Sequence, residues 1–209
     1  MTIPSAVVFD LGKVLVDFDY GIAARRIAAG GRMTIQEIAQ YIQQSSLFVQ
    51  YELGAVTTQQ FCAEICRVTG FRASLAEFGE CFADIFVPIE PMVQLQATLR
   101  QRGLPAYIFS NTNELAVEHI SRSFPFYANF DGYILSYQHG AMKPDARLYE
   151  VVERQSAGRG AEILYLDDRP ENVAAGAARG WQVILHQNPE QTRTEIINLG
   201  LLDYESSPS

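Results

Sequence analysis

The most constraining feature of this sequence is a set of five short apolar runs spaced along the chain. Each run is rich in β-branched or aromatic residues, and it is continuously apolar rather than alternating with polar positions. Strands of a parallel sheet have continuously apolar sequences because helices cover both faces of the sheet. The runs are SAVVFD (5–10), PAYIFSN (105–111), FDGYILS (130–136), EILYLDD (162–168) and WQVILH (181–186). The sequence therefore predicts a sheet of five parallel strands.

Helical patterns separate these runs. A pattern over 91–102 has Pro91 in its first turn and Gly103 just past its end, a second runs over 144–155, and a third runs from Pro170 to Gly180. Proline near the start and glycine after the end are typical of helix boundaries. Strands that alternate with helices predict a doubly wound, Rossmann-like α/β fold with right-handed crossovers.

Residues 18–88 interrupt this alternation. They contain no predicted strand, and three capping boxes follow one another in TIQE (34–37), TTQQ (57–60) and SLAE (74–77). We interpret this segment as an all-helical cap, with residues 1–17 and 89–209 forming the α/β core. Loops at the carboxyl ends of parallel strands surround the ligand crevice, so a cap inserted after the first strand is placed to act as a lid.

Composition limits the classes of function. With 209 residues, of which 48% are hydrophobic, the chain is long enough for one sizeable core and a smaller second lobe. No apolar run approaches the ~20 residues that span a bilayer, and the N-terminus lacks a secretory signal, so we expect a cytoplasmic protein without membrane association. A net charge of −8 disfavours nucleic acid as a partner, although a local cationic pocket can still hold a small phosphorylated metabolite. The sequence gives no indication of oligomeric state.

Polar residues follow four of the five predicted strands. They are Asp10, the pair Ser110 and Asn111, Lys143 in the loop after the third strand, and the pair Asp167 and Asp168. Each has an ordinary alternative as a helix cap or an exposed loop residue, but together they would meet at one edge of the sheet. Carboxylates gathered there repel one another unless a cation lies between them, and oxygen ligands favour Mg²⁺.

Such a site suits phosphate chemistry. Ser110 and the backbone N–H groups at the start of the next helix can hold phosphoryl oxygens, while Lys143 balances the remaining negative charge. An ionised Asp10 can then attack phosphorus in line, forming an aspartyl-phosphate that water hydrolyses.

Four segments resemble the motifs of the haloacid dehalogenase (HAD) superfamily, in order and over essentially the whole chain. They are FDLGKVLVD, IFSNTN, MKPDARLY and LYLDDRPENV. The resemblance implies Asp10 as nucleophile and Mg²⁺ ligand, the Gly12 backbone carbonyl as a second ligand, and Asp168 with Asp167 as the acidic group of the fourth motif. It also implies Ser110, Asn111 and Lys143 as phosphate-binding groups, with Lys143 also catalytic, and Asn172 as a supporting residue. FDLG, in place of a motif with two aspartates, resembles the first motif of a bacterial subgroup of sugar-phosphate phosphatases that acts on α-D-glucose 1-phosphate.

Gly12 departs from the superfamily pattern. Most phosphatases of this superfamily have a second aspartate there, which protonates the leaving oxygen and then activates water. We consider three explanations: a substrate with a good leaving group, such as a sugar 1-phosphate; a proton supplied by Asp17, Lys13 or a cap residue; or a weakly active relative. Cap residues Phe48, Tyr51 and Glu52, around YELG, are candidates to face a substrate.

Two other functions are considered for the same set of residues. A 2-haloacid dehalogenase also lacks the second aspartate, but it needs no metal, so the Asp167 and Asp168 pair favours phosphate chemistry. The other alternative is a non-catalytic module that binds a phosphorylated ligand. The presence of Asp10 argues against it, because such a module has no chemical need for a charged nucleophile.

Overall fold

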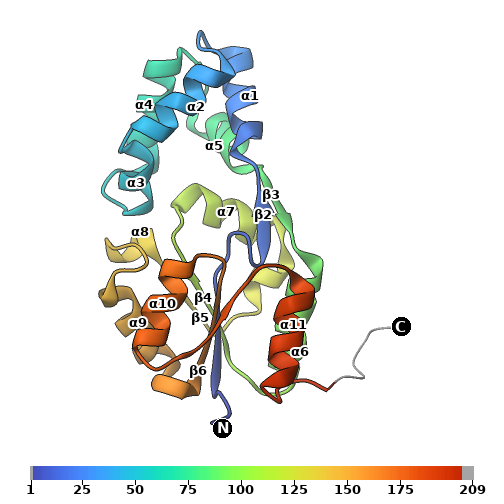
Figure 1. Ribbon diagram of the computed structural model, residues 1–209. Coiled ribbons are helices and arrows are strands. Elements are labelled where there is room, and N and C mark those ends of the chain that lie inside the picture. The colour runs from blue at the N-terminus through green and yellow to red at the C-terminus, as the bar shows by residue number, and fades with distance from the viewer. Residues whose placement is uncertain (1, 204–209) are drawn as a thin grey trace.

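The computed structural model describes residues 2–203 and contains a five-stranded parallel sheet at its centre (Figure 1). The strands are β1 (Ala6–Phe9), β4 (Ala106–Ser110), β5 (Gly132–Leu135), β6 (Ile163–Asp167) and β7 (Gln182–Leu185). Their order across the sheet is β5-β4-β1-β6-β7. The chain thus winds outward from β1 in one direction, returns, and winds outward in the other. The prediction of a doubly wound α/β fold is confirmed, and the five predicted runs are its strands.

Helices cover both faces of this sheet. On one side lie α6 (Glu90–Gln101), α7 (Glu114–Ser123) and α11 (Pro189–Asn198), and on the other lie α9 (Ala146–Ser156) and α10 (Pro170–Ala178). Three short pieces complete the core: α8 (Ser136–His139) after β5, η1 (Pro125–Ala128) and η2 (Gly160–Glu162). Within residues 2–203, every helix is too short or too polar to cross a membrane.

One predicted helix boundary is wrong. The helix after Lys143 begins at Ala146 rather than at Pro144, because the Asp145 side chain accepts a hydrogen bond from the Arg147 N–H and caps the helix there. Pro91 and Pro170 do lie in the first turns of their helices, as expected.

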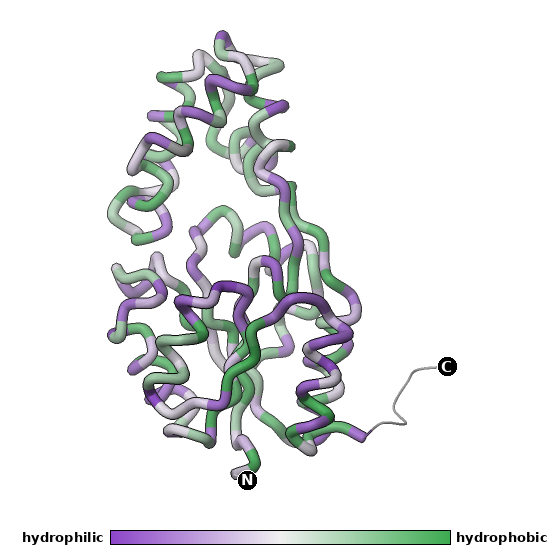
Figure 2. Tube along the Cα trace, viewed as in Figure 1, coloured by the Kyte–Doolittle hydropathy of each residue, from purple (hydrophilic) through white to green (hydrophobic). Residues whose placement is uncertain are grey.

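The strands alternate between two apolar layers. Val7 and Phe9 of β1 pack into the layer under α6, while Ala6 and Val8 pack into the layer under α9. All four side chains are buried, which is why β1 reads as a continuous apolar run. Figure 2 shows the same feature as hydrophobic colouring along the central strands.

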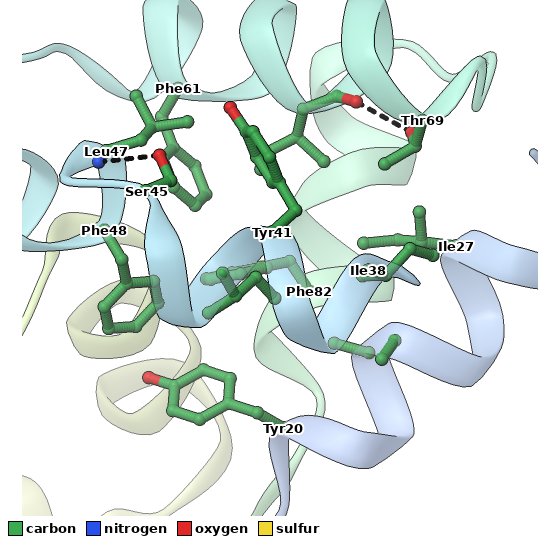
Figure 3. A pocket seen from close by; sticks show the side chains of 14 residues that line it. Tyr20, Ile27, Ile38, Tyr41, Ser45, Leu47, Phe48, Phe61, Thr69 and Phe82 are labelled. Atoms are coloured by element: carbon green, nitrogen blue, oxygen red, sulfur yellow. Dashed lines mark hydrogen bonds between the residues drawn. The ribbon is translucent and has the colours of Figure 1, made fainter. Parts of the chain in front are cut away.

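Residues 20–83 form five helices that lie beyond the carboxyl edge of the sheet (Figure 1). They are α1 (Tyr20–Gly30), α2 (Ile35–Gln44), α3 (Leu47–Glu52), α4 (Thr58–Thr69) and α5 (Leu75–Ala83). All three predicted capping boxes are present, with Thr34, Thr57 and Ser74 as N-caps. These helices share a separate apolar core, which encloses a cavity of about 20 Å³ (Figure 3). That volume is about the size of one water molecule, so this cavity is a packing gap rather than a ligand site.

The link between the helical segment and the core is a two-stranded antiparallel ribbon. It pairs β2 (Val16–Phe18) with β3 (Phe86–Pro88), with Phe18 opposite Phe86. The expectation of no strand within 18–88 is therefore wrong at both ends of the segment. Three residues are too few to show an alternating pattern, and the two strands are joined only through contacts between distant parts of the sequence. We keep residues 18–88 as the proposed cap.

Candidate active site

The register of the parallel strands gathers the predicted polar residues at one edge of the sheet. Phe9 pairs with Ile108 of β4 and with Leu166 of β6, so Asp10, which follows Phe9, lies beside Asp167 and close to the end of β4 at Ser110. The Asp10 N–H donates to the Leu166 carbonyl at 2.9 Å. β1 is the strand from which the chain winds in both directions, and ligands of such sheets bind at that switch point.

Lys143 is buried among the acidic groups of this edge. Its Nζ lies 3.0 Å from Asp10 Oδ1 and 2.6 Å from Asp167 Oδ2, and it also donates to the Phe109 carbonyl at 2.8 Å. An ammonium so placed offsets the repulsion between the two carboxylates. Lys143 thus acts as the internal counter-ion of the site.

The side chain of Asn111 holds the Lys143 loop. Its Oδ1 accepts a hydrogen bond from the Lys143 N–H at 2.7 Å, and its Nδ2 donates to the Lys143 carbonyl at 3.1 Å. Both groups of the Asn111 side-chain amide are therefore used in positioning Lys143. Ser110 is buried beside it, with its Oγ 3.4 Å from the Asn111 carbonyl.

Asp10, Asp167 and Asp168 each offer a carboxylate oxygen, and these three oxygens lie within 4.8 Å of one another. Oδ1 of Asp10 contacts Lys143 and the Leu11 N–H, while Oδ2 accepts no hydrogen bond from residues 2–203. The Gly12 carbonyl likewise accepts none within that range. Hard oxygen donors of this kind, spaced this closely, fit a divalent cation such as Mg²⁺.

Asp167 and Asp168 differ in how their carboxylates are used. Oδ1 of Asp167 accepts from the Arg169 N–H at 2.8 Å and from Asn172 Nδ2 at 3.0 Å, while Oδ2 accepts from Lys143 and from the Tyr165 hydroxyl. The Asp168 carboxylate accepts no hydrogen bond from any other described residue. Asp168 is therefore the freer of the two to contact a cation.

Tyr165 is a site residue that the sequence interpretation missed. It lies two positions before Asp167 on β6, and side chains two apart on a strand share a face, so its spacing was the available signal. Asn172 lies where the motif resemblance implied, and its carbonyl accepts a hydrogen bond from the Tyr149 hydroxyl at 2.9 Å.

Burial and charge shift the acidic groups in different directions. Burial raises the pKa of Asp10 to about 7, although Lys143 acts to lower it. Burial also acts to raise the pKa of Asp167, but Lys143 and the donated hydrogen bonds outweigh it and leave that pKa below its ordinary value. Burial, followed by the charge of Asp167, raises the pKa of Asp168. Negative charge on Asp10 and Asp168 is thus costly in the absence of a further cation.

Two of the cap helices contact the core beside this site. The Ser136 Oγ donates to the Glu52 carbonyl at the end of α3, at 2.7 Å, and the Leu115 N–H of α7 donates to the Tyr51 hydroxyl at 3.2 Å. Thr58 of α4 bonds both the Tyr51 hydroxyl and the Glu114 carboxylate. Figure 1 shows α3 above α8, on the side of the molecule away from the β2–β3 ribbon. The cap is thus joined to the core on two sides.

A family model described as haloacid dehalogenase-like hydrolase matches residues 4–180. A D-ribitol-5-phosphate phosphatase of Bacteroides thetaiotaomicron is 24% identical over 197 residues, covering 91% of this chain and 95% of the relative. A solved structure of a HAD family enzyme from the same species, in complex with magnesium and inorganic phosphate, superposes with a TM-score of 0.77 at 22% identity, covering 88% of this chain and 94% of that one. An L-2-haloacid dehalogenase of Xanthobacter autotrophicus superposes with a TM-score of 0.61 at 20% identity, covering 93% and 83%.

The family match spans most of the chain, and the structural likenesses agree with it in fold. This chain belongs to the haloacid dehalogenase-like hydrolases.

Proposed function

We propose that this chain is a Mg²⁺-dependent phosphatase that hydrolyses a small phosphorylated metabolite through an aspartyl-phosphate on Asp10. The observation that carries the proposal is the cluster of three carboxylates, Asp10, Asp167 and Asp168, with the Lys143 ammonium bonded to two of them. The phosphatase name of the Bacteroides relative, and the magnesium and phosphate in the Bacteroides structure, support the same chemistry.

The residues fit a Mg²⁺ ion in a defined way. Asp10 Oδ2, the Gly12 carbonyl and the Asp168 carboxylate are the proposed ligands, because these oxygens accept no hydrogen bond from another residue within 2–203. Asp167 is proposed to support the site through Lys143 and Asn172 rather than to bind directly. When bound, the ion supplies positive charge that keeps Asp10 and Asp168 ionised and screens the approach of a phosphate dianion.

The remaining residues are assigned to the phosphoryl group. Ser110 Oγ and the Asn111 backbone N–H hold its oxygens, and Lys143 balances charge as the bond to Asp10 forms. The Asn111 side chain sets the position of Lys143 rather than binding phosphate.

Within this function we propose a sugar phosphate as substrate, with a preference for a sugar 1-phosphate. The anomeric oxygen of such an ester is less basic than an ordinary alkoxide and leaves more readily, which suits a site with glycine at position 12. Glucose 1-phosphate should accordingly be hydrolysed faster than glucose 6-phosphate, and equal rates would contradict the preference.

The dehalogenase alternative is less well supported by the site. Asp168 has no donor among the other described residues, and a reaction that needs no metal gives that half-buried charge no role. The likeness to the Xanthobacter dehalogenase is one of fold.

A screen of sugar phosphates, nucleotides, phosphorylated acids and 2-haloacids, each with Mg²⁺ and with EDTA, tests the function. We expect hydrolysis of phosphate esters that EDTA abolishes, and no release of halide. Asp10→Asn should remove this turnover, whereas Asp17→Asn, which changes an exposed carboxylate paired with Lys13, should retain it. Halide release that persists in EDTA, or unchanged phosphatase activity in Asp10→Asn, would overturn the proposal.

A further inference from the structure

Gly12 offers no proton donor for the leaving oxygen, and the space beside it is closed to a larger side chain. A Cβ built on Gly12 would lie 2.9 Å from Cε1 of Phe18, so the phenyl ring of β2 occupies the region into which an acidic side chain would extend. If the chain hydrolyses phosphate esters as proposed above, an alkoxide leaving group still needs a proton from another residue.

The neighbouring polar residues of the same loop do not supply it. Lys13 and Asp17 form an ion pair with each other, with side chains 46% and 62% exposed. Lys13 also donates to the Phe18 carbonyl and lies over the Phe18 ring. Both charges are therefore held on the outer surface, on the ribbon that leads to the cap.

The cap, by contrast, places an acidic residue beside the phosphate loop. The carbonyl of Glu52 accepts a hydrogen bond from Ser136 Oγ at 2.7 Å, and the same hydroxyl accepts from the Thr112 N–H at 2.9 Å. Thr112 lies two residues after Ser110. One serine therefore ties the end of α3 to the loop assigned to the phosphoryl group.

Packing holds Glu52 at that position. A Cβ on Gly54 would lie 2.2 Å from the Tyr137 carbonyl, so the turn after α3 lies directly against α8 with no room for a side chain. Glu52 itself is half-buried. The charged and titratable groups that act on it or respond to it are Asp10 at the end of β1, Arg169 before α10, and Tyr20 of α1.

The surroundings of the Glu52 carboxyl favour its protonated form, so it loses its proton at a higher pH than an ordinary glutamate does. Burial, followed by the negative charge of Asp10, raises its pKa to about 7, against a lowering effect of Arg169. A carboxyl that titrates near the working pH can both donate and accept a proton, as a general acid and base must.

We propose that Glu52, from the cap, is the general acid and base of this site in place of the residue missing at position 12. In the first step the Asp10 carboxylate forms a bond to phosphorus, the bond from phosphorus to the ester oxygen breaks, and the Glu52 proton passes to that oxygen, so a neutral alcohol leaves. In the second step the Glu52 carboxylate takes a proton from water as the water oxygen bonds to phosphorus. The bond from phosphorus to Asp10 then breaks, which releases inorganic phosphate and restores both carboxyl groups.

The test compares two esters in the wild-type protein and in Glu52→Gln, both with Mg²⁺. An alkyl phosphate needs a proton on its leaving oxygen, whereas p-nitrophenyl phosphate releases a stable phenolate without one. We expect kcat/KM for the alkyl ester to fall by ~10²–10⁴-fold in Glu52→Gln. The value for p-nitrophenyl phosphate should stay within about threefold, since kcat/KM reports the steps up to departure of the first product.

The second step gives an independent prediction. Glu52→Gln should release a burst of p-nitrophenolate equal to the enzyme concentration, followed by slow turnover. The slow step is hydrolysis of the aspartyl-phosphate, because the variant has no general base to take a proton from the attacking water. Glu64→Gln, which changes a half-buried glutamate of α4 paired with Arg67, is the matched control and should behave as wild type. Glu52→Asp should recover part of the lost alkyl activity.

A readout without turnover accompanies these rates. Carbon-13 labelling of glutamate in the metal-free protein should show one carboxyl that titrates near pH 7 and is absent from Glu52→Gln. Equal losses on both esters, no loss on either, or a Glu52 signal that titrates near its ordinary pH would overturn the role of Glu52. A wild-type protein that hydrolyses neither ester with Mg²⁺ would instead overturn the proposed function, and this role with it.

Discussion

Single residues decide the electrostatics of this site, and Lys143 has the largest share. Its ammonium bonds Asp10 and Asp167 and is itself fixed by the Asn111 side chain through the backbone. Burying three charged groups together is tolerable because each has a partner of opposite sign and further hydrogen bonds. Asp168 forms no ion pair with another described residue, and on this difference we propose Asp167 as the structural residue of the pair and Asp168 as the one that binds the cation.

Paired variants test this separation. Asp167→Asn should lower the free energy of unfolding by about 3–5 kcal/mol in EDTA, because it leaves the buried Lys143 short of a counter-charge. Asp168→Asn should leave that free energy unchanged or slightly raised, since it removes a carboxylate whose ionised form is disfavoured there. Urea unfolding monitored by circular dichroism measures both.

The same two variants should differ in how much Mg²⁺ raises their free energy of unfolding. Saturating Mg²⁺ should stabilise the wild type, by about 2.7 kcal/mol at a hundred times the dissociation constant, and Asp168→Asn should lose this gain. A Mg²⁺ response that survives in Asp168→Asn but disappears in Asp167→Asn would reverse the assignment.

Much of the site could be predicted at this scale, but not its hydrogen bonding. Asp10, Ser110, Lys143 and the aspartate pair lie at the ends of strands or in the loops after them, and parallel strands bring their carboxyl ends together. The use of the Asn111 amide to hold Lys143 depends on a contact across 32 positions, which one sequence without structure does not show.

At the scale of elements, the structure joins the cap to the core through the β2–β3 ribbon and through the contacts of α3 and α4. Continuously apolar strands and capped helices carry strong local patterns, so they were predictable. The ribbon and the seating of α3 on α8 depend on packing between distant segments. The helix start at Ala146 was missed for another reason: Pro144 and Asp145 are both acceptable at a helix boundary, and the side-chain cap made by Asp145 decides where the helix begins.

The hydroxyl of Tyr51 ties the cap to α7, and its removal tests that contact. Tyr51→Phe leaves the Leu115 N–H without its acceptor, which costs about 1–3 kcal/mol when the group stays buried. Because this contact exists only when the cap lies on the core, we expect KM for a sugar phosphate to rise several-fold, with a smaller change in kcat. Tyr41→Phe, which changes a partly buried tyrosine that lines the cavity of the cap (Figure 3), is the control. An unchanged KM in Tyr51→Phe would show that the contact does not govern closure.

In the whole molecule, the apolar layers of the sheet and the apolar core of the cap are separate clusters, although Leu115 of α7 belongs to the cap core and Phe86 packs against both. The acidic groups of the site lie at the carboxyl edge of the sheet, beyond which the cap helices lie (Figure 1). Closing the cap over Asp10 removes water from carboxylates and so couples the protonation of Glu52 to folding. This coupling makes the stability of the metal-free protein depend on pH.

The sign of that dependence follows from the raised pKa of Glu52. Its carboxyl has a folded pKa of about 7 against an ordinary value of 4.5, so its contribution to stability is fully present below pH 4.5 and is lost as pH rises through 7. The free energy of unfolding of the wild type, relative to Glu52→Gln, should therefore fall by up to about 3 kcal/mol between pH 4 and pH 8 in EDTA. Parallel pH profiles for the two proteins would contradict the burial of this carboxyl.

The proposed reaction requires that Asp10 becomes phosphorylated during turnover, and acid quenching of the reaction can trap that intermediate. With Mg²⁺ and a phosphate ester, rapid quenching followed by mass spectrometry of peptides should find one added phosphoryl group on Asp10, in greater amount in Glu52→Gln, where its hydrolysis is slowed. Turnover of the ester with no phosphoryl group on Asp10, or with the group on another residue, would contradict the account.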